Sequence, residues 1–223
     1  MKFLNKMIKS EILLRIFDLS IAVSLILIFS PLIVLIAFCI KVSDRRSPVF
    51  AENHMRVGRD GKLFFMYKFR TMIPHAHELL HSDPRFSKLR EKYDANGAKL
   101  KIKDDIRVTS VGKIIRRFDL DELPQLFNVV KGDMSMVGWR AYFKQEVDSY
   151  SRQHTDFRKK IKFVLKIKPG VTGLWQISGR NLLSINKRIA YDYEYYKKKS
   201  ILFYILILLK TPYIVLTRYG AYE

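Results

Sequence analysis

The chain has 223 residues, with 41 Lys or Arg against 21 Asp or Glu, which gives a formal net charge of +20 at pH 7. This length suits one compact domain plus a membrane element, and the charge favours polyanionic partners such as nucleic acid, anionic lipid or phosphorylated substrates. The single cysteine, Cys39, excludes an intramolecular disulfide framework and a cysteine-based zinc site, and it points to a reducing compartment.

An uncharged apolar segment, 19–40, follows a basic N-terminal flank. As a helix it would be about 33 Å long, enough for a hydrocarbon core of about 30 Å. Ser30-Pro31 lies in its middle, where the proline removes a helical hydrogen bond. Because basic residues flank both ends, we predict a membrane re-entrant hairpin over 1–48, with Asp18 at its mouth paired with the basic flank. An ordinary kinked transmembrane helix is the alternative.

The pattern changes after this segment, which predicts a cytoplasmic domain over 49–223. Residues 47–72 alternate apolar and polar side chains around a turn signal, so we expect a hairpin or two short strands. Helical spacing follows at 75–95 and again after Thr109. Residues 155–167 combine an apolar stripe with many basic side chains, which suits either an anionic membrane surface or a basic helix packed on its own core.

Three lysines precede a C-terminal apolar stretch that is too short to span a bilayer. We predict an interfacial helix over 201–217, with a buried core helix as the alternative. The expected fold is therefore a helix-dominated α/β domain, anchored to one membrane face by the N-terminal hairpin and by amphipathic surface helices.

Carboxylates, arginines and glycines crowd together at 104–140, with Asp121-Glu122 among them. Such a mixture suits phosphate chemistry, because arginines neutralise a diphosphate while a carboxylate can hold a divalent cation. On composition alone a simpler explanation is favoured, in which the two acidic residues complement a helix N-terminus.

Two short motifs suggest metal binding. Residues 77–81 match H-E-x-x-H, in which two histidines one helical turn apart bind zinc. A third ligand is not evident, so we interpret them as solvated helix histidines. Asp119-Leu120-Asp121 matches the D-x-D arrangement with which glycosyltransferases bind a metal diphosphate, and it points to the same substrate class.

Longer motifs in a fixed order carry a resemblance to a known family. They are Ser30-Pro31, YKFRTM at 67–72, DDIRVTSVGKIIRR at 104–117, DELPQLFNV at 121–129, KGDMSMVG at 131–138 and KPGVTGLWQISGR at 168–180. Through them nearly the whole chain resembles the bacterial sugar transferase family of monotopic phosphoglycosyl transferases. It is most similar to the catalytic domains of undecaprenyl-phosphate galactose or glucose phosphotransferases.

The resemblance implies an enzyme on the cytoplasmic face of the bacterial inner membrane that begins a surface glycan, such as an exopolysaccharide or lipopolysaccharide. It would move a sugar-1-phosphate from a UDP-sugar to polyprenyl (undecaprenyl) phosphate and release UMP. The resemblance implies that Asp121 is the nucleophile, forming an aspartyl phosphosugar, and that Glu122, with Asp121, holds Mg²⁺. Matched positions also suggest phosphate or nucleotide contacts, or site support, for Lys68, Arg70, Arg116, Arg140, Gln176, Arg180 and Asp192.

The remaining expectations concern partners and rival functions. Anionic lipids are expected partners and nucleic acid is not, while the sugar, the glycan pathway and homodimer formation stay open. A metal-dependent glycosyltransferase that uses Asp119 and Asp121 would release UDP in place of UMP. A basic membrane-binding or nucleic-acid-binding module without enzyme activity is a further alternative.

The chain departs from the family pattern at two positions. The segment GWRAY at 138–142 replaces the usual G-P-R-P, so we expect Arg140 to be held differently and Trp139 to alter the sugar or lipid pocket. Asp119 stands where Ser or Thr is common, and its added negative charge could help to bind metal.

Overall fold

The computed structural model describes residues 2–52, 55–95, 105–217 and 220. Helices dominate this part of the chain, and the strands form two small two-stranded sheets. The predicted helix-dominated α/β fold is confirmed. The α-helices are α1 (Lys2–Ser43), α2 (Ala76–Ser82), α3 (Ser87–Ala95), α4 (Ser110–Arg117), α5 (Gln125–Lys131), α6 (Lys144–Gln153), α7 (Thr155–Val164), α8 (Leu174–Ile177), α9 (Ile185–Lys198) and α10 (Ile201–Thr217). The 3-10 helices are η1 (Arg59–Gly61), η2 (Pro84–Phe86), η3 (Leu120–Glu122) and η4 (Arg180–Leu182).

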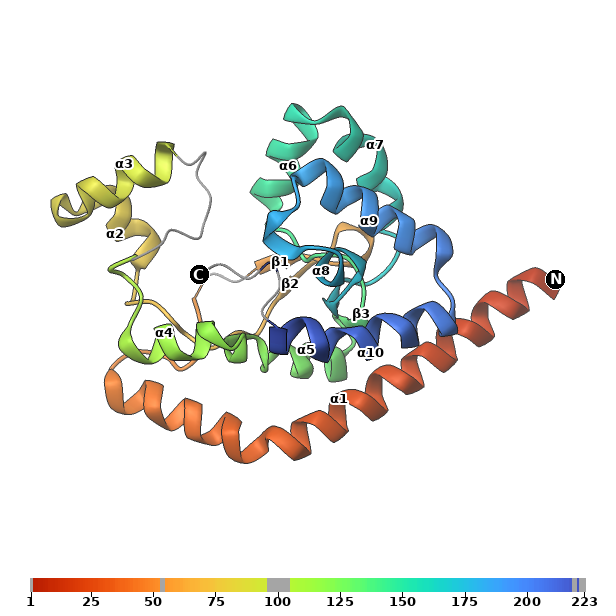
Figure 1. Ribbon diagram of the computed structural model, residues 1–223, viewed down its shortest axis with the longest axis horizontal. Helices are drawn as coiled ribbons and strands as arrows, with labels where there is room; N and C mark the ends of the chain where they lie inside the picture. Colours follow the sequence, from red (N-terminus) through yellow and green to blue (C-terminus); the bar gives the residue numbers. More distant parts are fainter. Residues whose placement is uncertain (1, 53–54, 96–104, 218–219, 221–223) are drawn as a thin grey trace.

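The N-terminal helix α1 is one continuous helix of 42 residues with Pro31 inside it. It runs along one edge of the molecule and bends in its C-terminal half (Figure 1). Pro31 has no N–H to offer the carbonyl of Leu27, and the hydroxyl of Ser30 donates to that carbonyl at 2.9 Å instead. The expected hairpin of two helices is therefore replaced by one bent helix, and the re-entrant path stays a prediction. Within the described residues, only its stretch Glu11–Ser43 is long and apolar enough to cross a membrane.

Asp18 fastens α1 to the rest of the molecule from a buried position. It accepts hydrogen bonds from the Ser135 hydroxyl at 2.8 Å, the Met136 backbone N–H at 2.7 Å and the Tyr204 hydroxyl at 2.7 Å. The predicted pairing of Asp18 with the basic flank is wrong, because these three neutral donors from β3 and α10 satisfy the carboxylate. A buried carboxylate is tolerated only when it is hydrogen-bonded in this way.

Arg15 makes a second connection, one turn earlier on α1. Its guanidinium donates to the backbone carbonyls of Val129 at 2.6 Å and Val130 at 2.9 Å, near the C-terminal end of α5. Carbonyls in the last turn of a helix lack intrahelical partners, and a cation there also complements the helix dipole. Arg15 therefore joins α1 to α5.

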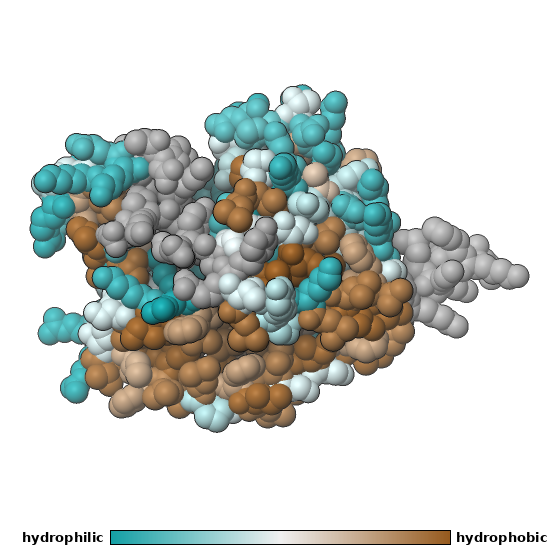
Figure 2. Space-filling model, viewed as in Figure 1, coloured by the Kyte–Doolittle hydropathy of each residue, from teal (hydrophilic) through white to brown (hydrophobic). Residues whose placement is uncertain are grey.

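The C-terminal helix α10 packs beside α1, with Tyr204 and Ile207 buried. Its other face exposes large apolar side chains, including Leu202 at 70%, Leu209 at 71% and Leu216 at 82% of their surface. Figure 2 shows apolar residues gathered along the edge formed by α1 and α10, whereas hydrophilic residues gather at the opposite edge. Apolar surface of this kind is typical of a membrane-binding face.

Helix α7 lies at the hydrophilic edge, away from α1 (Figure 1). Its apolar stripe, Phe157, Ile161 and Val164, is buried in the protein's own core, largely against α9. Of the two interpretations of this basic helix, packing on its own core is the one found, and the stripe is not available to a membrane.

The predicted hairpin at 47–72 is confirmed, since β1 (Met55–Val57) pairs antiparallel with β2 (Leu63–Phe65). The other sheet pairs β3 (Ser135–Val137) parallel with β4 (Gly170–Thr172). At the end of β3 the backbone of Gly138 approaches Gly170 of β4 so closely that a Cβ on Gly170 would clash with the Gly138 nitrogen. Only glycine fits there. The contact fixes where the segment after β3, which carries Arg140, begins.

Candidate active site

Lys68 brings the two acidic residues of the central motif together. Its Nζ lies 2.9 Å from Oδ2 of Asp121 and 3.2 Å from Oε1 of Glu122. The backbone N–H of Phe69 donates to the Asp121 carbonyl at 3.0 Å, which joins the strand-like segment of Lys68 to η3. Burial alone would lower the pKa of Lys68, but the charges of Asp121 and Glu122 outweigh it and raise the pKa. Lys68 is therefore a fixed cation beside two carboxylates.

Helix α4 places Arg116 near the same carboxylates. Thr109 caps the helix by accepting from the Gly112 N–H at 2.9 Å, and Gly112 lies directly against the Thr71 carbonyl. Arg116 donates through Nε to the Thr71 hydroxyl at 2.8 Å. Burial lowers the pKa of Arg116, while the negative charge of Asp121 opposes the shift. The structure thus brings Lys68 and Arg116 to Asp121, as expected.

Asp119 and Arg180 form an ion pair, with 2.6 Å between Oδ2 and Nη2. Both residues have positive φ angles, of 54° and 48°. The added charge at position 119 is therefore neutralised by Arg180, a residue expected to contact substrate. Asp119 and Asp121 engage different cations, so the structure does not support a shared D-x-D metal site.

The altered segment after β3 holds Arg140 through a carboxylate. Arg140 Nη2 donates to Oε1 of Glu146 at 3.3 Å, and the other oxygen of Glu146 accepts from the Phe143 N–H at 2.7 Å. Trp139 is fully buried, and its indole N–H donates to the Ile167 carbonyl at 2.9 Å. The expectation that Trp139 alters a substrate pocket is wrong, since the ring is part of the core. Its burial and hydrogen bond fix the segment that departs from the expected G-P-R-P pattern.

For three of the predicted site residues, the described contacts do not involve the two carboxylates. Arg70 is held by the Asp44 carboxylate at 3.0 Å and by the Pro48 carbonyl at 2.7 Å, which joins the end of α1 to the domain. Asp192 is completely buried on α9, and burial raises its pKa well above the usual value. Gln176 has a buried amide oxygen that no described residue satisfies.

Sequence reasoning missed Arg56 and Glu146. The Arg56 guanidinium lies 3.0 Å above the centre of the Phe143 ring, and burial lowers its pKa to about 9. Three charges have smaller effects on the pKa of Arg56. In decreasing order, Glu146 raises it, Arg140 lowers it and Glu122 raises it. The sequence held one signal for Arg56, because it is a charged residue at the centre of a predicted strand.

The chain as a whole matches a known protein family. The family model described as Bacterial sugar transferase matches residues 9–218. The chain belongs to the bacterial sugar transferase family. This sugar transferase is 41% identical over 217 residues to the undecaprenyl-phosphate galactose phosphotransferase of Salmonella typhimurium, and the match covers 96% of the chain and 42% of that protein.

Two further relatives extend the comparison. The UDP-galactose-lipid carrier transferase of Erwinia amylovora is 40% identical over 214 residues, with 96% of the sugar transferase and 42% of the relative covered. The exopolysaccharide production protein ExoY of Rhizobium meliloti is 39% identical over 209 residues, with 93% and 87% covered. The chain thus spans about two fifths of the length of the Salmonella and Erwinia proteins, and most of ExoY.

The donor atoms of the sugar transferase also bear on metal binding. Among the described residues, no three His, Cys, Asp or Glu side chains gather to hold an ion. His77 and His81 contact each other edge to face on α2 without a third such partner in this part of the chain. Mg²⁺, however, is ordinarily bound by one or two carboxylates together with substrate phosphates and water. The adjacent carboxylates of Asp121 and Glu122 fit that requirement.

Proposed function

We propose that this sugar transferase moves a sugar-1-phosphate from a UDP-sugar to undecaprenyl phosphate, as the initiating step of an exopolysaccharide or another surface glycan. The observation that carries the proposal is the buried Asp121 carboxylate in contact with Lys68, beside the more exposed Glu122. The printed names of the relatives, which specify undecaprenyl phosphate, UDP-galactose and exopolysaccharide, support the same substrate classes.

Asp121 is the proposed nucleophile of the first step. One of its carboxylate oxygens attacks the sugar-linked phosphorus of the UDP-sugar and forms a new P–O bond. The bond from that phosphorus to the bridging oxygen breaks, and its electron pair leaves with UMP. Lys68 holds the carboxylate in place, and its positive charge, with that of Arg116, stabilises the negative charge of the transferring group.

Undecaprenyl phosphate is the proposed acceptor in the second step. An oxygen of its deprotonated phosphate attacks the phosphorus of the aspartyl phosphosugar. The bond from phosphorus to Asp121 breaks, which restores the carboxylate and leaves a sugar linked to undecaprenyl diphosphate. Lys68 begins the reaction protonated, since both carboxylates raise its pKa.

Mg²⁺ is the proposed cofactor, held by Asp121 and Glu122. When bound, it would neutralise the negative charge of the diphosphate. Glu122 suits this role because 41% of its side chain is exposed, against 5% for Asp121. A carboxylate that reaches solvent can share an ion with a substrate.

The proposed location is the cytoplasmic face of the bacterial inner membrane. The apolar edge formed by α1 and α10 supports a membrane-bound position (Figure 2), and basic residues before and after the apolar run support a cytoplasmic domain. Anionic lipids are proposed partners of the basic surface. An acceptor anchored in the same membrane would then meet the site from the lipid side.

Measurement of the released nucleotide tests the function. Solubilised protein would be incubated with undecaprenyl phosphate, Mg²⁺ and a panel of UDP-sugars, and we expect UMP. Asp121→Asn should lower UMP release by about 10³-fold or more, because the nucleophile is lost. Asp148→Asn, which changes an exposed carboxylate on α6, is the matched control and should retain full activity.

Two results would contradict the proposal. Full turnover by Asp121→Asn would exclude the covalent mechanism, and release of UDP in place of UMP would indicate a glycosyltransferase. Mass spectrometry adds a direct readout. Wild-type protein mixed with UDP-sugar alone should gain the mass of a sugar phosphate, and Asp121→Asn should not.

A further inference from the structure

Three arginines in the described part of the chain are almost completely buried, and one of them differs from the others. Arg107 is 4% exposed, and its guanidinium is satisfied by both oxygens of Asp105 and by the Ala76 carbonyl. Arg70 is 6% exposed and is held by a carboxylate and a carbonyl. Arg56 is 7% exposed, yet no described residue accepts a hydrogen bond from its Nε or Nη1.

An incompletely satisfied buried cation is costly. Transfer of a guanidinium out of water carries a large desolvation cost, which is offset only when carboxylates or carbonyls accept its hydrogen bonds. The Phe143 ring under Arg56 supports one face of the guanidinium plane but accepts none of its in-plane N–H groups. Each of the three guanidinium nitrogens of Arg107 donates to an acceptor, whereas Nε and Nη1 of Arg56 are buried without one among the described residues.

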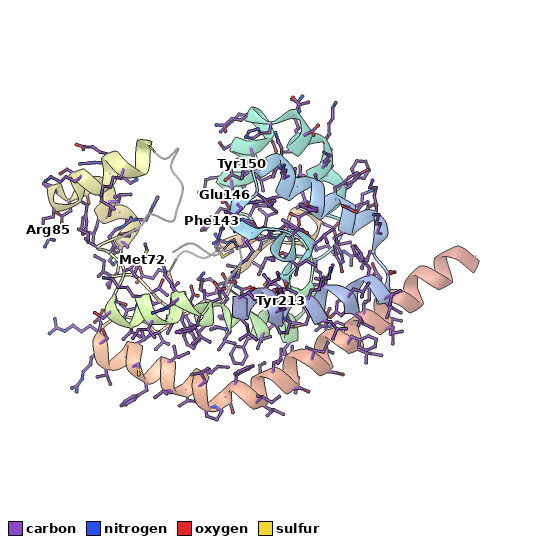
Figure 3. The ribbon with its side chains drawn as sticks, in the orientation of Figure 1. Met72, Arg85, Phe143, Glu146, Tyr150 and Tyr213 are labelled. Atoms are coloured by element: carbon purple, nitrogen blue, oxygen red, sulfur yellow. The ribbon has the colours of Figure 1, made fainter. Side chains whose placement is uncertain are left out.

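The charges around Arg56 locate it relative to the catalytic carboxylates. The carboxylates acting on its pKa are Glu146 and Glu122, whereas those acting on Lys68 are Asp121 and Glu122. The charge of Glu122 therefore acts on both cations, Arg56 lies against Phe143 just before α6, and Lys68 contacts Asp121 and Glu122 directly. In Figure 3, Phe143 and Glu146 lie close together at the start of α6.

The two cations match the two phosphates of a nucleoside diphosphate sugar. The phosphorus under attack must lie against Asp121 and Lys68, so the second phosphate, which departs with the nucleoside, lies beyond it. Arginine is suited to that group, because its planar fork donates two parallel hydrogen bonds to phosphate oxygens. Phe143 would hold the fork in one orientation before the substrate arrives.

We infer that Arg56, supported by Phe143, binds the phosphate of the departing nucleoside monophosphate. This inference rests on the proposed function, because it assumes a nucleoside diphosphate donor attacked at Asp121. It assigns a substrate-binding role to the hairpin of β1 and β2, which carries no other predicted site residue. Arg140 supports this role because it binds the Glu146 carboxylate. Without that contact, Glu146 would compete with the substrate phosphate for the Arg56 guanidinium.

Binding of UMP and of uridine to the full-length protein in detergent tests this inference without turnover. Arg56→Met should weaken UMP binding by about 10- to 100-fold, the factor for one charge-assisted hydrogen bond, and leave uridine binding unchanged. Arg56→Lys, which keeps the charge but loses the planar fork, should fall between wild type and Arg56→Met. Arg59→Lys, on the exposed turn of the same hairpin, is the matched control and should bind UMP as wild type does.

Several outcomes would overturn the inference. One is unchanged UMP affinity in Arg56→Met or, where that variant does not fold, in Arg56→Lys. Another is an equal loss of uridine affinity, which would place Arg56 against the base or ribose. A third is weakened binding of undecaprenyl phosphate with UMP binding intact, which would assign Arg56 to the acceptor. Failure of the proposed function is distinguishable, since wild-type protein would then bind UMP at Arg56 yet release none from any UDP-sugar.

Discussion

The Nζ of Lys68 and Oδ2 of Asp121 lie 2.9 Å apart, and both side chains are largely buried. Removal of one member of a buried pair leaves the other charge without compensation, which costs about 3–5 kcal/mol. Lys68 also contacts Glu122, so one cation is in contact with both neighbouring carboxylates. The first two predictions follow from this position.

Lys68→Met should destabilise the fold by about 3 kcal/mol and lower UMP release by about 10²-fold or more. Lys68→Arg should be milder, since it keeps the charge. Thermal unfolding and the UMP assay measure the two effects, with Lys62→Met on the exposed hairpin as the control. If Lys68→Met had the melting temperature and turnover of wild type, the ion pair would contribute neither to stability nor to catalysis.

The stability contributed by Lys68 should not vary through the neutral pH range. Because its folded-state pKa is raised above 10.5, the contribution is complete below that pH and is lost only as the pH rises through the folded-state value. The difference in melting temperature between wild type and Lys68→Met should therefore stay constant from about pH 6 to about pH 9. A difference that shrinks within this interval would contradict the raised pKa.

Asp119→Ser should lower the stability of the fold but have little effect on turnover. The variant removes the ion pair with Arg180 and should cost about 2 kcal/mol of stability, yet turnover at a permissive temperature should stay within about tenfold of wild type. Loss of activity as severe as that of Asp121→Asn would revive the metal-binding D-x-D interpretation. Restoration of stability by a matched change at Arg180 would confirm the pair as its source.

Asp18→Ala should loosen α1 from the domain. The change leaves the Met136 N–H and the Tyr204 hydroxyl without their acceptor, at a cost of about 3 kcal/mol. Tyr204→Phe, which removes one donor, should cost about 1 kcal/mol. Proteolysis and thermal unfolding in detergent would measure both variants, and equal stability of Asp18→Ala and wild type would mean that the hydrogen bonds do not hold α1.

The re-entrant path of α1 predicts that both of its ends face the cytoplasm. A cysteine introduced in place of Lys2, in a Cys39→Ser background, should be labelled only when reagents reach the cytoplasmic side. Pro31→Ala should straighten the helix, since it restores an N–H for the Leu27 carbonyl that Ser30 now satisfies. Labelling of position 2 from the periplasm in the otherwise unaltered chain would establish a span.

Local patterns predicted most of the secondary structure. The helical spacing after Thr109 and at 155–167, and the turn signal at Asp60-Gly61, each led to the element found, because these signals depend only on neighbouring residues. The apolar segment was predicted equally well as a helix, but not its continuity through Pro31. That continuity depends on a hydrogen bond from Ser30, a side-chain detail that hydrophobicity does not encode.

The site was predicted only where a motif match supplied long-range information. Spacing alone could not bring Lys68 to Asp121, and the match named both. It also named Arg70, which instead joins α1 to the domain. Arg56 was missed because its importance depends on burial and on Phe143, a ring far along the chain. The sequence wrongly predicted Trp139 to line a pocket, because the Ile167 carbonyl that binds its indole in the core is also distant in sequence.

The bond from Arg15 to the carbonyls of α5 has a geometric consequence for catalysis. Helix α5 begins three residues after Glu122, and Arg15 binds its C-terminal end. Helix α5 therefore connects the apolar helix α1 rigidly to the two carboxylates. In the proposed membrane-bound position, this connection would fix the height of Asp121 above the lipid. The proposed acceptor, which diffuses in the plane of the bilayer, would then reach Asp121 by a search in two dimensions, because its phosphate would lie at the same height.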